Sequence, residues 1–140
     1  MIIRKLLAFI FTSVIVTSIF VTLHIIDQPS NSFWGWFWFI GFYSGLWILF
    51  YGIPVSIFSD RITKRFTNIR RSMAALITHL FFGIIITFIL YLFQNTTFDE
   101  YWIQWGKLMF IASILSSFVL WMIDEILRKI ADWERIQSSL

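Results

Sequence analysis

The chain has 140 residues, of which 59% are apolar, 21% aromatic and only 14% charged, with a formal net charge of +3. A water-soluble domain is about 45–50% apolar and about 25% charged, so this composition excludes such a domain and predicts a membrane protein. The absence of cysteine excludes disulfide bridges and thiolate metal sites.

Four runs of the sequence are long and apolar enough to cross a membrane as helices. A helix needs about 20 mainly apolar residues to span a hydrocarbon core about 30 Å thick. The runs cover residues 6–26, 33–58, 73–93 and 105–123, with a basic linker at 59–72 and a tail at 124–140. We therefore predict an all-α polytopic membrane protein, a single domain in which four transmembrane helices form a compact bundle.

The positive charges predict the orientation of these spans. All the Lys and Arg residues except Lys107 fall before the first run, in the linker or in the tail. Because Lys and Arg collect on the cytoplasmic side, we expect both termini to be cytoplasmic. The same rule explains the net positive charge without a nucleic-acid partner, and the partner that we expect in all cases is the lipid bilayer.

Small residues mark candidate helix contacts, because they let helix backbones approach closely within a membrane. In the second run, Gly41 and Gly45 form a GxxxG pattern, and Gly52 and Ser56 continue the same α-helical face. In the third run, Gly83 belongs to a stripe at steps of four residues with Ala75, His79 and Thr87. The pattern does not say whether such contacts are internal or join two chains.

Proline and histidine are the other unusual residues of these runs. Pro54 lacks an amide donor for the carbonyl of Phe50, so we expect a static kink or a hinge in the second span. His79 is the one titratable candidate well inside a span, where a function or a structural hydrogen bond across helices would account for it. His24 falls at the outer interface.

The sequence offers little for catalysis. No Asp or Glu lies inside the four runs, which argues against a proton-coupled multidrug exporter, and no nucleophile, metal or phosphate-loop motif is present. We expect no enzyme activity, no cofactor and no metal site.

The cytoplasmic segments carry a clearer pattern. In the linker, Ile62, Phe66 and Ile69 have helical spacing, which suits either a short amphipathic helix on anionic lipid or a solvated loop. The basic residues that we expect to meet anionic headgroups are Arg61, Lys64, Arg65, Arg70 and Arg71.

The tail should continue the fourth span as a helix. It repeats apolar residues at steps of three and four, and its charges suit pairs of Asp124 with Arg128 and of Glu125 with Lys129. The apolar face of the tail would rest on headgroups or receive a partner helix.

The order of parts, and in particular FYGIPVSIFSD followed by a basic linker and a His-containing third span, resembles an uncharacterised family of small four-span membrane proteins from Bacillus-type bacteria. The resemblance implies a bacterial plasma membrane and supplies no site residues.

The leading hypothesis is a non-enzymatic accessory, regulatory or immunity-type protein that acts through helix contacts, as a homo-oligomer or with another membrane protein. The alternative is a small oligomeric transporter or channel with a pathway lined by Ser13, Thr17, His79 and Ser117.

Overall fold

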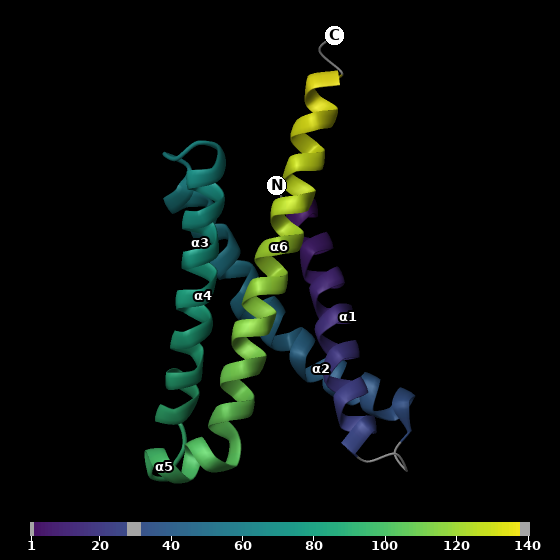
Figure 1. Cartoon of the computed structure of the whole chain (residues 1–140), viewed down its shortest axis with the longest axis vertical. Helices are drawn as coiled ribbons and strands as arrows, with labels where there is room; N and C mark the ends of the chain where they lie inside the picture. Colours follow the sequence, from purple (N-terminus) through teal and green to yellow (C-terminus); the bar gives the residue numbers. More distant parts are fainter. Residues whose placement is uncertain (1, 28–31, 138–140) are drawn as a thin grey trace. The chain divides into compact units, whose positions relative to one another are not determined.

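All the regular elements in the described part of the chain are helices. The computed structural model describes residues 2–27 and 32–137, without the side chains of 68 and 134–136. In chain order (Figure 1) the elements are α1 (Ile2–Asp27), α2 (Phe33–Trp47), the π-helical turn η1 (Ile48–Gly52), α3 (Ile53–Thr63), α4 (Asn68–Leu92), α5 (Phe98–Tyr101), the π-helical turn η2 (Trp102–Gly106) and α6 (Lys107–Gln137).

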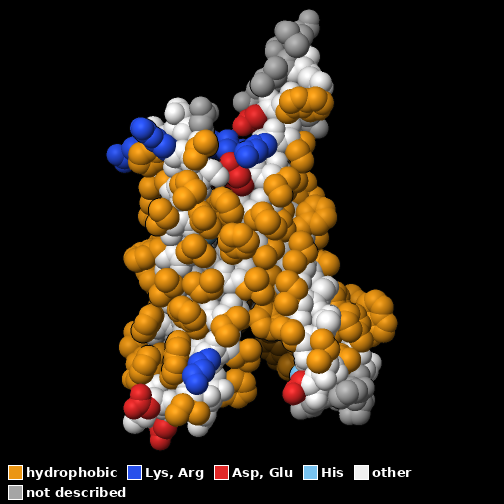
Figure 2. All heavy atoms as spheres, viewed as in Figure 1, with side chains coloured by type: hydrophobic (Ala, Val, Ile, Leu, Met, Phe, Trp, Pro, Cys, Tyr) orange, Lys and Arg blue, Asp and Glu red, His pale blue; other side chains and the backbone are white. Residues whose placement is uncertain are grey.

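Four helical stretches among the described residues are long and apolar enough to cross a membrane. They cover Ile2–Asp27, Phe33–Thr63, Ile69–Leu92 and Phe98–Trp133. Apolar side chains cover the length of these helices, as Figure 2 shows for one face, which is the surface that lipid requires. The predicted all-α fold with four membrane-spanning helices is confirmed.

The helices form two compact units. The first combines Met1–Pro54 with Met122–Leu140, and the second is Val55–Trp121. In the first unit α1 packs along α2 and η1, with Ala8, Val16 and Val21 fully buried. In the second unit α4 pairs with the first part of α6, and the rings of Phe58 on α3 and Phe82 on α4 meet edge to face.

The fourth membrane stretch begins earlier than the predicted residue 105. Thr97 caps the helix that starts at Phe98, because its hydroxyl accepts the amide of Glu100 while the Glu100 carboxylate accepts the amide of Thr97. The helix then runs through η2 into α6, so Lys107 is exposed nine residues inside this stretch rather than near its first residue.

The second span contains a π-helical turn directly before Pro54. In η1 the amide of Ile53 bonds to the carbonyl of Ile48, five residues back, which is how the backbone adapts to the nearby proline. A π turn inserts about one residue into the helical register. Gly52 and Ser56 therefore do not continue the face of Gly41 and Gly45 at α-helical spacing, and the predicted four-residue stripe is wrong in this respect.

The basic linker is shorter than predicted. α3 continues to Thr63 and α4 begins at Asn68, so the non-helical connection is only Lys64–Thr67. The short amphipathic helix considered for the linker does not form, since Ile62 belongs to α3 and Ile69 to α4. The basic residues instead lie at the end of α3, in the turn and at the start of α4.

Candidate functional site

A buried ion cluster joins α1 to α6 in the first unit. The Lys5 ammonium donates to one carboxylate oxygen of Asp124 at 2.6 Å, and the Arg4 Nε donates to the other at 2.9 Å. Lys5 is 3% exposed and Asp124 is 8% exposed. A buried ionised carboxylate needs such partners, because the loss of hydration is offset only by close counter-charges and hydrogen bonds.

The cluster fixes the relative height of two helices. It brings the start of α1 beside the stretch of α6 that follows Ile123, so these two parts of the chain lie at one end of the first unit. This contact agrees with four spans, an even number that would put the first residues of the first span and the last residues of the fourth on the same side of a membrane.

The ion pairs of α6 differ from those predicted. Asp124 pairs with α1, and Arg128 pairs with Glu125 at i,i+3 and with Asp132 at i,i+4. The predicted pairs of Asp124 with Arg128 and of Glu125 with Lys129 are therefore wrong. The reason is that Lys5 and Arg4 approach Asp124 from α1 and pair with it. Arg128 pairs instead with Glu125 and Asp132 of its own helix.

The contact of α1 with α2 depends on a glycine and two hydroxyls. A side chain at Gly41 would place its Cβ 3.3 Å from the Thr17 methyl group, so glycine lets Thr17 sit close to α2. The hydroxyls of Thr17 and Ser44 lie 3.1 Å apart, and Ser44 also donates to the carbonyl of Gly41. Thr17 and Ser44 therefore share a hydrogen bond across the two helices.

The other small residues of the second span have different surroundings. Gly45 is partly exposed, and apart from its chain neighbours and its own helix backbone no described atom lies within 4 Å of the Cβ that a side chain would add there. Gly52 ends η1 and is partly exposed, whereas Ser56 is buried at the start of the second unit. Of the predicted contact residues in this span, Gly41 makes an internal helix contact and Gly45 is left open.

The same device joins α4 to α6 in the second unit. A Cβ at Gly83 would lie 2.5 Å from the Ser117 hydroxyl and 3.1 Å from the Ser113 carbonyl oxygen. The hydroxyls of Thr87 and Ser113 are 3.1 Å apart, and the buried Tyr101 hydroxyl donates to the Thr87 carbonyl at 3.2 Å. Gly83 therefore lies against the part of α6 that carries Ser113 and Ser117.

His79 is buried on α4, with 2% of its surface exposed. Its Nδ1 lies 2.9 Å from the carbonyl oxygen of Ala75, one turn earlier on the same helix. A carbonyl oxygen only accepts, so Nδ1 carries the proton and, in the neutral ring, Nε2 is an acceptor. This hydrogen bond is local, unlike the cross-helix bond considered from the sequence.

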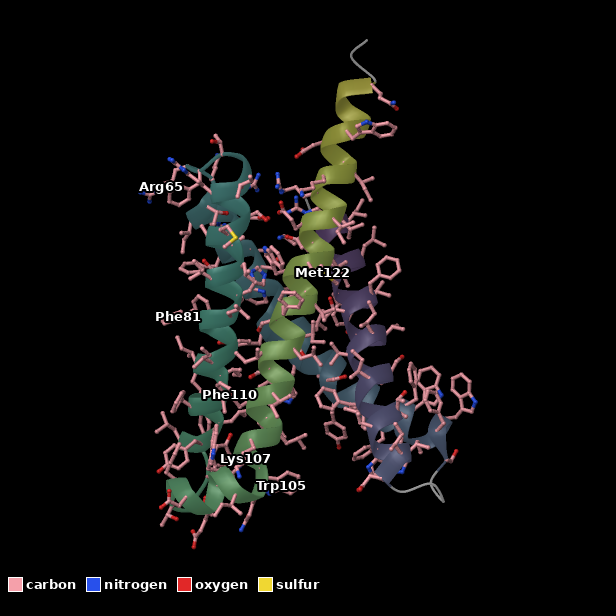
Figure 3. All side chains as sticks on the ribbon, in the orientation of Figure 1. Arg65, Phe81, Trp105, Lys107, Phe110 and Met122 are labelled. Carbon is pink, nitrogen blue, oxygen red and sulfur yellow. The ribbon has the colours of Figure 1, made fainter. Side chains whose placement is uncertain are left out.

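The five predicted lipid-contact residues surround the turn between α3 and α4. Arg61, Lys64, Arg65 and Arg70 are exposed, while Arg71 is partly buried and pairs with Asp60 at 3.5 Å. Figure 3 shows Arg65 and Lys107 at opposite ends of the second unit. Asp99 and Glu100 belong to α5, which lies at the same end as Lys107. The second unit therefore carries its basic cluster at one end and most of its carboxylates at the other (Figure 2).

The described surface shows no built ligand site. The described residues contain no group of three or more His, Asp or Glu side chains able to hold a metal ion. Two hollows on this surface are open and mainly apolar: one lies on α6, lined by Phe110, Ile111, Ile114, Leu115 and Phe118, and the other lies at the start of α2, lined by Ser32, Gly35, Trp36 and Phe39.

Sequence reasoning missed the pairing of Lys5 and Arg4 with Asp124. The available signal was that a basic pair precedes the first span and an acid follows the fourth on the same predicted side. Comparison of the chain with protein-family models, with curated proteins and with solved structures gives no match.

Proposed function

We propose that this polytopic membrane protein is a non-enzymatic accessory, regulatory or immunity-type partner that acts through contacts of its helices with another membrane protein or with further copies of itself. The observation that carries the proposal is the open glycine at Gly45, one turn beyond a glycine that already serves as a helix contact. A GxxxG pair whose first member packs internally leaves its second member available to a helix from outside.

The use of polar groups within the spans supports the same proposal. Thr17 with Ser44, and Thr87 with Ser113, bond across helices, and Lys5 with Asp124 ties α1 to α6. These groups hold helices in register, which is the task of a scaffold that presents helix faces. Of the residues in the alternative transport pathway, Thr17 and Ser117 lie in such contacts.

We further propose that the chain lies in a bacterial plasma membrane with both termini cytoplasmic. The basic turn around Lys64 would then face the cytoplasm, where each Lys or Arg near an anionic leaflet contributes about 1 kcal/mol. No nucleic acid and no cofactor enters this proposal.

The test uses crosslinking from position 45. The chain has no native cysteine, so in the Gly45→Cys variant a thiol-reactive photo-crosslinker attaches to this chain at position 45 alone. The full-length variant is expressed and labelled in the protein's own membranes. We expect a specific adduct with a second polypeptide, either a different membrane protein or another copy. A matched control, Ile111→Cys, places the probe on an exposed apolar face of α6.

Adducts from position 45 that are no more frequent than those from position 111 would contradict the proposal. In that case Gly45 faces lipid rather than a partner helix, and the transporter or channel alternative becomes the leading hypothesis.

A further inference from the structure

The cytoplasmic end of α6 carries an apolar stripe that nothing in the described part of the chain covers. Ile126 is 50% exposed, Ile130 49% and Trp133 60%. They recur at steps of four and three residues, after Ile123, which is buried at 8% exposed. Isolated apolar residues on a surface are ordinary, but three aligned on one helical face mark an interaction surface.

The helix geometry argues against the membrane surface as the occupant of this stripe. α6 is one helix from Lys107 to Gln137, and Asp124 lies beside the first turn of α1. At about 1.5 Å per residue, Trp133 stands roughly 14 Å farther along the axis than Asp124. In Figure 1 this end of α6 extends past the start of α1. A helix that leaves the membrane along its own axis exposes its side faces to water rather than to lipid headgroups.

The spacing of the stripe is that of a coiled-coil seam. With Ile123 and Ile130 at a positions, Ile126 and Trp133 fall at d positions. The charged residues Glu125, Arg128 and Asp132 are at c, f and c positions, away from the seam, and pair with one another along the helix. The exposed part of this apolar face, formed by Ile126, Ile130 and Trp133, is therefore left to a partner helix.

We propose that the partner is the same segment of a second copy of this chain, packed in parallel. In this register Lys129 is at a g position and, five residues later in the sequence, Glu134 is at the next e position. These are the two positions that meet between helices of a parallel two-stranded coiled coil, so the sequence is complementary to itself. Lys129 is exposed and makes no ion pair within the described residues.

The membrane compensates for the weak association of a short coiled coil. Two heptads associate weakly in solution, but two copies in one membrane are confined to a layer and share one orientation. That shared orientation also makes the pairing parallel. This surface is separate from Gly45, so the dimer proposal and the proposed function can fail independently.

The first test is disulfide crosslinking of the full chain in membranes at low protein density. Facing a positions of a parallel dimer are close enough for a disulfide, whereas b positions are not. We expect Ile130→Cys to form disulfide dimers about five-fold more than Ala131→Cys, a neighbouring exposed control. Equal yields, no dimers from either variant, or adducts of Ile130→Cys with a different protein alone would overturn the proposal.

The second test changes charges at facing positions to determine the register of the two helices. In the Ile130→Cys background, Lys129→Glu places like charges at both facing positions, and we expect about five-fold less dimer. Adding Glu134→Lys restores opposite charges and should restore the yield, which also shows that the variants fold. An unchanged yield with Lys129→Glu, or no recovery in the combined variant, would contradict a parallel pairing in this register.

Discussion

At the scale of single residues, several polar side chains within the apolar helices find partners in one of two ways, whereas the buried hydroxyls of Thr12, Ser13 and Ser59 have no hydrogen-bond partner among the described residues. Some hydroxyls donate to a carbonyl of their own helix, as Ser18 does to Val14 and Thr78 to Ala74, both at 2.8 Å. Others reach a neighbouring helix, as Thr17 does. The first kind follows from the sequence alone, because its partner is always one turn away. The second depends on helix rotation, which the sequence pattern does not contain.

The ion cluster gives the prediction with the largest effect. Asp124→Asn removes the counter-charge closest to the buried Lys5 ammonium, so we expect the free energy of unfolding to fall by about 2–4 kcal/mol. Lys5→Met should cost less, at most about 1–2 kcal/mol, because Arg4 still pairs with the carboxylate. Reversible unfolding of the full chain in detergent micelles measures both. A larger loss from Lys5→Met than from Asp124→Asn would contradict this account of the cluster.

At the scale of elements, one packing device occurs twice. In each unit a glycine faces a hydroxyl-bearing residue of the neighbouring helix, and a hydroxyl one turn after the glycine completes a bond across the pair. Gly41 with Ser44 and Gly83 with Thr87 are the two cases. Glycine spacing indicated which helices would make close contacts because close backbone approach demands small residues, but Gly45, the second member of the GxxxG pair, has no such neighbour. The spacing did not predict η1, since a π turn is a local change in backbone hydrogen bonding that glycine spacing does not specify.

A matched glycine pair tests this device. Gly83→Ala puts a Cβ against the Ser117 hydroxyl and the rigid Ser113 carbonyl, so we expect a loss of about 1–3 kcal/mol in unfolding free energy. Gly45→Ala meets no described atom and should change stability by less than about 1 kcal/mol, in the favourable direction that alanine has in helices.

A second substitution distinguishes a steric conflict at Gly83 from a general effect of replacing a glycine in a helix. Ser117→Gly removes the side chain that meets the new Cβ, so we expect the Gly83→Ala, Ser117→Gly double variant to lose less stability than the sum of its two single variants. Additive losses in the same unfolding measurement would show that α4 and α6 do not meet at Gly83.

At the scale of the whole molecule, the number of spans was predictable and their ends were not. The thickness of the bilayer sets the length of an apolar run, so hydropathy finds four helices. The ends depend on local devices, such as the Thr97 capping box, which starts the last helical stretch before its apolar run, and α3, which carries Arg61 inside a helix. The pairing of Asp124 with residues about 120 positions earlier is a property of the folded chain alone.

The charge distribution predicts which connections share a side of the membrane. Thr67→Cys, in the basic turn, and Ala131→Cys, in the tail, should resist a membrane-impermeant maleimide in intact cells, whereas Asn95→Cys, in the opposite connection, should react. All three should react once the membrane is permeabilised. Labelling of position 67 in intact cells would contradict the proposed orientation, and labelling of only one of positions 67 and 131 would contradict an even number of spans.

The claim that this protein works through helix contacts is tested most directly by purifying it from its own membranes in mild detergent and determining the mass of the intact complex. For the wild-type chain we predict a defined complex with another membrane protein or with further copies. For Gly45→Ile we predict loss of the partner held through α2, while a dimer joined only through the end of α6 remains and the chain stays folded, because a Cβ at this position has no neighbour within 4 Å outside its own helix backbone. A wild-type chain recovered only as a monomer, or a complex that Gly45→Ile leaves intact, would contradict the claim.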